Sequence, residues 1–364
     1  MVIVFLQLLQ CVIDNRSVNI YRLKSEANKY DSKGKKIKQS SYYARFIRFF
    51  KMVGVREFCE GISQMLLICM GETNITHITI DRSNWKRGNK NINILCLGFN
   101  YGQCFIPLVW EQLDKRGNSN FEERKALIER FIKLMQITGR GTENIVLTAD
   151  REFIGTQWIA YLSSIKMDFV VRLKKNMFAQ IQEFGGLNKK RKLSYFNRHI
   201  ERFGKYCIPF VVAGVQYAVV MTKNKKNDSD EPYIYLLTTL KNAEQAMQKY
   251  TQRWNIECYF KHIKRNGFNT ECLNLKGNEK IHLMIGLVAM AYVLAIKQGL
   301  IKHFKYPIKM KQYKNGKKYF EISIFRAGLD ELINLIERCE KLIAFVFSLP
   351  FGNICKINPY AKFV

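Results

Sequence analysis

Five side chains between residues 250 and 264 have the types and spacing needed for chemistry on phosphates. At the roughly 100° per residue of an α-helix they share one narrow stripe, which contains Tyr250, Arg253, Glu257, Lys261 and Lys264. This stripe surrounds one carboxylate with three cations and a phenol, a set that suits a metal ion at the carboxylate beside a phosphate backbone held by the cations. The alternative is a solvated helix face with i,i+4 pairs such as Glu257–Lys261, the commoner meaning of a mixed-charge stripe.

The overall charge favours the first interpretation. The 364 residues include 59 Lys and Arg against 30 Asp and Glu, which gives a formal net charge of +29, and 48% of them are hydrophobic. So many hydrophobic residues can build a sizeable core, and the chain is not disordered by composition. Because self-repulsion of this size favours a polyanionic partner, nucleic acid is the first expected partner and an anionic membrane surface the second.

Two other compositional features exclude classes of site. The ten cysteines form no CxxC pair and no Cys/His cluster, so we expect buried thiols in a reducing compartment and no zinc site. The apolar runs Val2–Ile13 and Leu283–Ile296 are too short to span a bilayer, and we predict buried helices and no membrane association.

The order of predicted elements defines the fold class. Residues 1–70 have a helical, basic pattern, and three alternating strands follow, with loops of Gly and Asn between them. A capping box at Ser119–Glu122 then opens an amphipathic helix. The predicted strands are Thr76–Asp81, Asn91–Asn100, Cys104–Trp110, Ile145–Asp150 and Phe169–Leu173. A second predicted helix, Trp158–Ile165, lies between the last two strands. The order β-β-β-α-β-α-β predicts an α/β protein with a mixed sheet covered by helices, which is the order of a ribonuclease-H-like fold.

A β-rich insertion is expected between the fifth strand and the helix of Glu257. Its short runs are rich in Tyr, Phe, Val and Ile, and they are Leu193–Phe196, Cys207–Val212, Val215–Met221 and Tyr233–Thr239.

Two aspartates upstream complete a carboxylate set with Glu257. Asp81 is predicted to end the first strand and Asp150 the fourth, and these strands are neighbours at the centre of a sheet with this order. Three carboxylates on separate elements suit hard divalent cations, and a pair of such ions about 4 Å apart can drive an in-line phosphoryl displacement. The alternative for either aspartate alone is a turn residue at a strand end.

The spacing Tyr250-x2-Arg253-x3-Glu257-x6-Lys264 resembles the signature of the insertion-sequence-four family of transposases, which belong to the DDE superfamily with a ribonuclease-H-like core. The segments Thr79–Trp85, Thr148–Phe153 and Ser323–Leu329 are similar to further segments of that family. The resemblance covers roughly residues 70–340. It implies a catalytic, metal-binding triad that uses two ions of Mg²⁺ (or Mn²⁺) and consists of Asp81, Asp150 and Glu257. It also implies that Tyr250, Arg253 and Lys264 contact phosphates near the cleaved DNA end, whereas Lys261 rests on helix geometry alone.

Two further residues are candidates for DNA contact. Arg172 lies in the basic segment Phe169–Lys175, whose alternative role is a solvated loop. Tyr235, or its neighbour Tyr233, could stack on a base, because this strand lacks the Trp that hairpin-forming relatives use. The alternative is that both tyrosines are core residues of the strand.

We therefore expect a DNA transposase that cleaves double-stranded DNA at element ends and transfers the strand to target DNA, with or without a hairpin. A homodimer on DNA in the cytoplasm of a bacterium, associated with the nucleoid, follows from that activity. The alternatives are a non-catalytic DNA-binding derivative or inhibitor and a nuclease of the same fold. The expected regions are a basic helical N-terminal region that is a candidate for binding DNA ends (1–70), the first part of the catalytic core (71–174), the β-rich insertion (175–240), the second part of the core with the Glu helix (241–300) and a helical C-terminal region that is a candidate for dimerisation (301–364).

Overall fold

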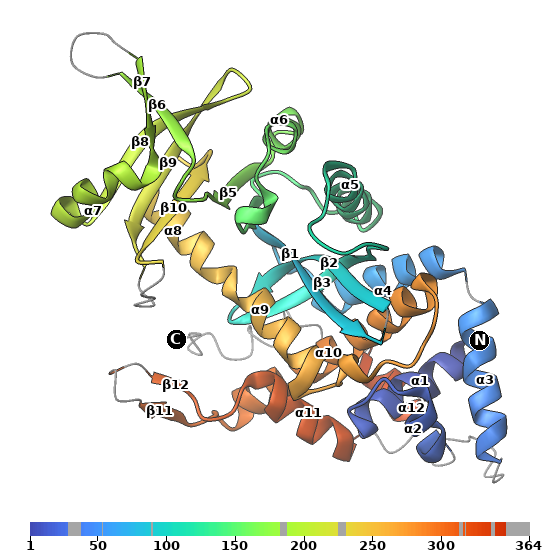
Figure 1. The fold of residues 1–364 in the computed structure, drawn as a ribbon. Coiled ribbons are helices and arrows are strands. Elements are labelled where there is room, and N and C mark those ends of the chain that lie inside the picture. The colour runs from blue at the N-terminus through green and yellow to red at the C-terminus, as the bar shows by residue number, and fades with distance from the viewer. Residues whose placement is uncertain are drawn as a thin grey trace.

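A computed structural model describes residues 1–27, 38–52, 54–88, 90–182, 188–224, 231–312, 316, 318–335 and 339–346 (Figure 1). A twisted sheet occupies the centre, the β-rich insertion extends it at one end, and helices from both ends of the chain pack together at the other end. The helical run α8–α9–α10 crosses between these two ends, and it carries the residues of the predicted stripe.

Within the described residues, eight strands form the central sheet in the order β3-β2-β1-β4-β5-β10-β9-β8. The strands are β1 (His77–Arg87), β2 (Lys90–Tyr101), β3 (Cys104–Gln112), β4 (Val146–Ala149), β5 (Asp168–Arg172), β8 (Lys205–Val212), β9 (Val215–Lys223) and β10 (Tyr233–Thr238). Strand β4 pairs in parallel with β1 and with β5, and the other neighbours are antiparallel. The predicted mixed sheet of a ribonuclease-H-like fold is confirmed.

The β-rich insertion contributes to two sheets. Strands β8 to β10 continue the central sheet through the pairing of β10 with β5, whereas β6 (Phe178–Gln182) and β7 (Asn188–Lys192) form a separate hairpin. The strand predicted at Leu193–Phe196 is wrong, because these residues form a 3-10 turn that leads into α7 (Asn197–Phe203).

Helices cover both faces of the sheet (Figure 1). On one face lie α5 (Phe121–Ile137) and α6 (Thr156–Ser164), and on the other lie α8 (Ala243–Gln252) and α9 (Trp254–Lys261). The capping box of α5 is formed by Asn120 and Glu123, one residue later than predicted. The predicted apolar face of α5 is confirmed, since its Leu127, Phe131 and Leu134 are buried.

Helix α8 begins where Asn242 accepts hydrogen bonds from two free backbone N–H groups, those of Glu244 and Gln245. Its Ala246 and Tyr250 pack on apolar residues of four adjacent strands, which are Val146, Val170, Val220 and Leu236. The helical path continues through Arg253 into α9 and ends in a π-helical turn at His262–Asn266. The helix expected for the stripe is therefore present.

The core at the other end is built around α10 (Asn278–Lys305). This helix is twice as long as the apolar run predicted from the sequence; by length and composition it could cross a membrane, and 94% of its most apolar stretch is buried inside the protein. Packed against α10 are the helices α1 (Val2–Asn15), α3 (Gln39–Met52), α4 (Val55–Met70) and α11 (Ile324–Leu335). The remaining elements are α2 (Ile20–Glu26), the hairpin of β11 (Met310–Gln312) with β12 (Lys318–Phe320), and α12 (Cys339–Val346).

The backbones of α10 and α11 touch at two glycines. A Cβ atom at Gly299 would overlap the backbone oxygen of Ile324, and one at Gly328 would overlap the backbone oxygen of Ala295. The two helices can approach this closely because neither position carries a side chain.

Candidate active site

Asp81 and Asp150 lie side by side where β4 ends. The parallel register of β1 and β4 reaches Ile80 opposite Ala149, so the residue that follows in each of these two segments is an aspartate. Asp150 follows the last residue of its strand, as predicted, but the prediction that Asp81 ends its strand is wrong. Strand β1 continues to Arg87 because it keeps its antiparallel pairing with β2, and only the pairing with β4 stops.

The guanidinium of Arg253 joins Asp81 to Glu257. Its Nη1 donates a hydrogen bond of 3.0 Å to Asp81 Oδ2, and its Nη2 donates to Glu257 Oε1. The other oxygen of Asp81 accepts a 2.7 Å hydrogen bond from the backbone N–H of Arg82. The partner of Glu257 in an i,i+4 ion pair is thus Arg253, one turn earlier, and not the Lys261 of the alternative interpretation.

Asp150 is connected to the same helical run by Tyr250. The hydroxyl of Tyr250 donates a 3.3 Å hydrogen bond to Asp150 Oδ1, and the ring lies 5.5 Å from the guanidinium carbon of Arg253. The structure therefore brings three carboxylates, Arg253 and Tyr250 together at the junction of α8 and α9.

Negative charge is costly at this place. Burial raises the pKa of Asp81 to about 7, and the nearby charges of Asp150 and Glu152 add to this effect, although Arg253 and the Arg82 N–H act against it. Burial also raises the pKa of Tyr250 to about 12. Burial of Arg253 lowers its pKa, but Tyr250 and the three surrounding carboxylates outweigh this and raise it. One guanidinium does not offset the charge of the cluster, which therefore favours further cations.

The donor set fits divalent cations by its chemistry. Carboxylate oxygens are the ligands that Mg²⁺ and Mn²⁺ prefer, and two of the three carboxylates already converge on one cationic group. As the described side chains stand, no three His, Cys, Asp or Glu residues are close enough together to hold an ion, because the guanidinium lies between Asp81 and Glu257. Its Nε has no hydrogen-bond partner among the described residues, so the group is not fully fixed by its surroundings.

The two lysines of the stripe differ in environment. Lys264 Nζ donates a 3.0 Å hydrogen bond to the backbone oxygen of Asn84 on β1 and lies 5.1 Å from the centre of the Trp85 ring. Burial lowers the pKa of Lys264. Lys261 is exposed.

Two predicted DNA contacts lie in the sheet beyond β4. Arg172 is an ion-pair partner of Glu231, at 2.6 Å, so its side chain is not part of a solvated loop. Tyr235 is 4% exposed and its hydroxyl donates to Asn197 Oδ1, at 2.6 Å. A ring this deeply buried offers no face to a base, so the core alternative describes Tyr235 in this structure. Its neighbour Tyr233 bonds Glu201.

Residues 110–294, just over half of the chain, match the family model described as "Transposase DDE domain". The chain belongs to the DDE transposase family. The matched range includes Asp150, the whole stripe and the β-rich insertion, and it begins after Asp81.

No curated protein matches the chain. Among solved structures it is similar to one described as "Cryo-EM structure of piggyBac transposase synaptic complex with hairpin DNA", at 13% sequence identity and a TM-score of 0.42. That alignment covers 99% of this chain and 75% of the other.

A buried ion pair supports the two aspartates of this DDE family member, and the sequence did not predict it. Arg82 donates to both oxygens of Glu152, at 3.2 and 3.0 Å, and also to Asn93 and Asn118. Because Arg82 follows Asp81 and Glu152 lies two residues after Asp150, the pair holds both aspartate segments together. The signal in the sequence was a pair of opposite charges, Arg82 one residue after Asp81 and Glu152 two residues after Asp150.

A neutral polar network lies next to the site. His77 Nε2 is 2.9 Å from Thr148 Oγ1, and His77 Nδ1 is 2.8 Å from Gln252 Oε1, so the ring links β1, β4 and α8. Thr79 bonds Thr148 across the same strands. The signal was the alternation of His77, Thr79 and Asp81, which places the three on one face of β1.

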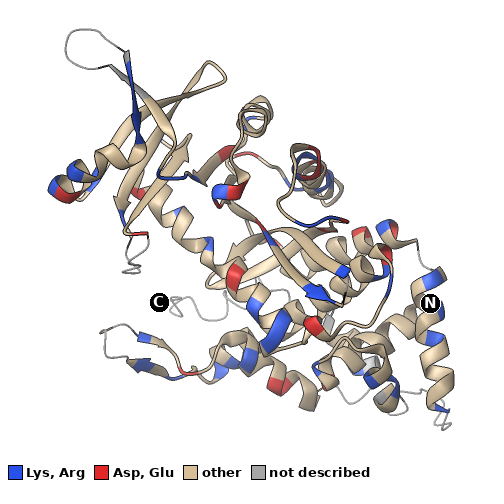
Figure 2. Ribbon diagram, viewed as in Figure 1, with Lys and Arg blue, Asp and Glu red and all other residues tan. Residues whose placement is uncertain are grey.

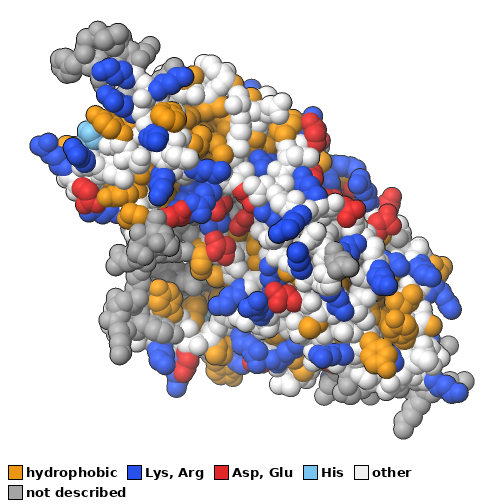
Figure 3. Space-filling view, viewed as in Figure 1, with side chains coloured by type: hydrophobic (Ala, Val, Ile, Leu, Met, Phe, Trp, Pro, Cys, Tyr) orange, Lys and Arg blue, Asp and Glu red, His pale blue; other side chains and the backbone are white. Residues whose placement is uncertain are grey.

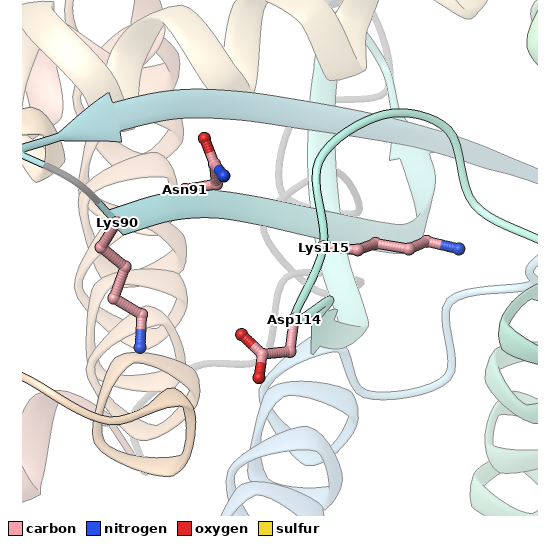
Figure 4. A pocket seen from close by; sticks show the side chains of 4 residues that line it. All are labelled: Lys90, Asn91, Asp114 and Lys115. Atoms are coloured by element: carbon pink, nitrogen blue, oxygen red, sulfur yellow. The ribbon is translucent and has the colours of Figure 1, made fainter.

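A pocket of about 430 Å³ lies at the far end of the β1–β2 hairpin, where Arg87 pairs with Lys90 (Figure 4). Lys90 and Asp114 point toward the space between them, and Lys115 points away from it and pairs with Glu123. Along β1, Asp81 lies several residues before Arg87, so the pocket is not part of the candidate active site.

Proposed function

We propose that this protein is a DNA transposase of the insertion-sequence-four type, which cleaves DNA at the ends of its element and joins the freed 3′ end to target DNA. The supporting observation is the convergence of Asp81, Asp150 and Glu257, from three separate elements, around Arg253. Membership of the DDE transposase family supports a DNA-transposing enzyme at the coarser level.

In this proposal Asp81, Asp150 and Glu257 hold two ions of Mg²⁺ or Mn²⁺. The bound ions would polarise the attacking and leaving oxygens of an in-line phosphoryl displacement. The protein's part is to hold the carboxylates: the Arg82 N–H orients Asp81, and the Tyr250 hydroxyl orients Asp150. With the carboxylates neutralised by bound cations, the Arg253 guanidinium would contact a DNA phosphate beside Lys261 and Lys264.

The partner in this proposal is double-stranded DNA. Lys and Arg positions occur along the ribbon from the N-terminal helices to the β-rich insertion (Figure 2), and the net charge of +29 favours a polyanion. Bringing two element ends together requires two active sites, so we propose a homodimer on DNA, in the bacterial cytoplasm at the nucleoid. A base-stacking role for Tyr235 is not part of the proposal.

The decisive experiment is Glu257→Gln, assayed with Mg²⁺ on DNA that carries the element's ends. Cleavage should fall by about a hundredfold or more, since a lost metal ligand removes several kcal/mol of charge stabilisation. The matched control is Glu129→Gln on the exposed surface of α5, which should cleave normally. Undiminished cleavage by Glu257→Gln would refute the assignment.

A second assay separates a transposase from a nuclease of the same fold. Pre-cleaved DNA with a free 3′ end should be joined to target DNA by the wild-type protein and not by Glu257→Gln. Denaturing gels of the cleaved ends report any hairpin product. Cleavage without any joining would favour the nuclease, and DNA binding without metal-dependent cleavage would favour a non-catalytic derivative.

A further inference from the structure

Two arginines converge on one carboxylate next to the candidate active site. Arg151 Nη1 donates to Glu231 Oε1, and Arg172 Nη2 donates to Glu231 Oε2 at 2.6 Å. The two guanidinium groups therefore hold both oxygens of a single anion. Glu231 lies just before β10, in the β-rich insertion, so the contact bridges the insertion and the core.

Both arginines are neighbours of Asp150, a proposed metal ligand. Arg151 directly follows Asp150, and the parallel register of β4 and β5 ends with Ala149 opposite Val171. The next residues on these two strands are Asp150 and Arg172, which are therefore neighbours across the sheet. In Figure 3 acidic and basic side chains gather on the visible face where the β-rich part meets the rest of the molecule.

The contact can be opened by a competing anion. The side chains of Arg151 and Glu231 are 47% and 29% exposed, so water weakens this ion pair, whereas Arg172 is 15% exposed and its pair with Glu231 is more sheltered. A phosphate offers oxygens in the geometry that guanidinium groups bind in pairs, and it carries a charge like that of the carboxylate it would replace.

We propose that Arg151 and Arg172 form a binding site for a phosphate of the DNA strand, and that Glu231 occupies this site in the DNA-free protein. Glu231 is then an internal competitor that DNA must displace. This inference rests on the proposed function only in taking DNA as the ligand; it does not depend on cleavage.

The test is Glu231→Gln, measured by fluorescence anisotropy with a labelled duplex oligonucleotide in EDTA, so that no cleavage occurs. Its matched control is Glu201→Gln, which removes the same charge from an exposed glutamate of the insertion that pairs with Lys223. We expect Glu231→Gln to bind DNA about three- to tenfold more tightly than Glu201→Gln, which corresponds to about 1 kcal/mol of lost competition. A merely structural ion pair predicts the opposite, because its loss would lower the melting temperature and weaken binding.

The arginines supply the second half of the test. In an Arg151→Gln/Arg172→Gln background the protein should bind DNA more weakly and with a shallower salt dependence, and Glu231→Gln should no longer improve binding. Equal affinities of Glu231→Gln and Glu201→Gln, or a gain that persists without the two arginines, would overturn the proposal.

Inorganic phosphate tests whether the ligand is DNA. If about 1 mM phosphate removes the gain of Glu231→Gln, the site takes free phosphate ions and the assignment to DNA fails. The metal-free assay also separates this inference from the proposed function. If Glu257→Gln abolishes cleavage while Glu231→Gln behaves like its control, only the phosphate site is refuted.

Discussion

Two charged contacts on either side of Asp150 have opposite compositions. At the junction of α8 and α9 one guanidinium, that of Arg253, is shared by the carboxylates of Asp81 and Glu257. Beside β5 one carboxylate, that of Glu231, is shared by two guanidinium groups. The first contact is deeply buried at Arg253 and Asp81, whose side chains are 9% and 14% exposed. In the second contact Arg151 and Glu231 are 47% and 29% exposed, and only Arg172, at 15%, is comparably buried.

This difference in burial determines how each contact can open. A buried charge that loses its partner is destabilised by several kcal/mol, so Arg253 can leave the carboxylates only when another cation arrives. The Arg151–Glu231 pair is opened at little cost because water reaches both partners. In the proposed function a metal ion would therefore have to exchange with Arg253, whereas DNA would displace Glu231 directly.

The largest expected effect is that of Arg253→Ala, which leaves the carboxylates of the buried contact without their cation. In EDTA the free energy of unfolding, measured with urea, should fall by about 3–5 kcal/mol. Mg²⁺ should restore part of this loss and should stabilise the variant more than the wild type. Arg326→Ala, which breaks an exposed i,i+4 pair with Asp330, is the control and should cost less than about 1 kcal/mol. Equal losses of unfolding free energy in Arg253→Ala and Arg326→Ala would show that burial does not make the Arg253 contact the stronger one.

Two glutamates beside Asp150 provide a matched pair for the same comparison. Glu152→Gln breaks its ion pair with Arg82, in which the side chains are 19% and 10% exposed, and should lower the free energy of unfolding by about 3 kcal/mol. Glu231→Gln should lower it by less than about 1 kcal/mol. Chemical denaturation of both variants at pH 7 gives the two values. If Glu231→Gln is the more destabilised protein, exposure does not decide which contact is exchangeable.

His77 tests a buried contact that carries no charge. Burial lowers its pKa from 6.5 to about 4, and the neighbouring charge of Lys249 acts in the same direction. The unfolded chain therefore binds a proton between pH 6.5 and 4 that the folded protein does not bind, and stability falls as the pH falls through this range. At pH 5 this contribution amounts to about 2 kcal/mol relative to pH 7.

The measurement for His77 is the difference in unfolding free energy between pH 7 and pH 5, compared between the wild type and His77→Gln. The variant should lack about 2 kcal/mol of the decrease, because glutamine does not titrate. Identical pH dependences would show that His77 is not held neutral in the folded protein.

The smallest expected effect is that of Tyr235→Phe. The variant loses the hydrogen bond to Asn197 and should lose about 1 kcal/mol of stability. Its affinity for DNA in the anisotropy assay should equal that of the wild type, because the ring is buried. A clear loss of DNA binding at unchanged stability would restore Tyr235 as a DNA contact.

The features that the sequence predicted correctly depend on local patterns. Alternating residues gave the strands, and their order along the chain gave the mixed sheet in which Asp81 and Asp150 meet. Helical spacing placed Tyr250, Arg253 and Glu257 on one side of a helix, and the structure turns that side toward both aspartates. The roles of these residues in metal and DNA binding stay predictions.

The features that it missed depend on distant partners. Strand β1 runs past Asp81 because β2 pairs with it, and the residues from Arg82 to Arg87, polar except for Trp85, gave no sign of this. The apolar run noted in the sequence stops at Ile296, but α10 continues to Lys305. The buried Lys297 within it donates to the backbone oxygen of Phe345, 48 residues later. Glu231 is 80 residues from Arg151, so no spacing rule connects them.

The glycine contact between α10 and α11 has a consequence for large-scale mutagenesis. Nearly every substitution at Gly299 or Gly328 would push the two helices apart, so both positions should score as intolerant in a saturation screen for transposition. An exposed residue such as Lys261 should tolerate most substitutions unless it contacts DNA. Intolerance in such a screen would therefore mark both the places where backbones touch and the places where chemistry occurs, and measurements of protein abundance in the same cells would separate the two.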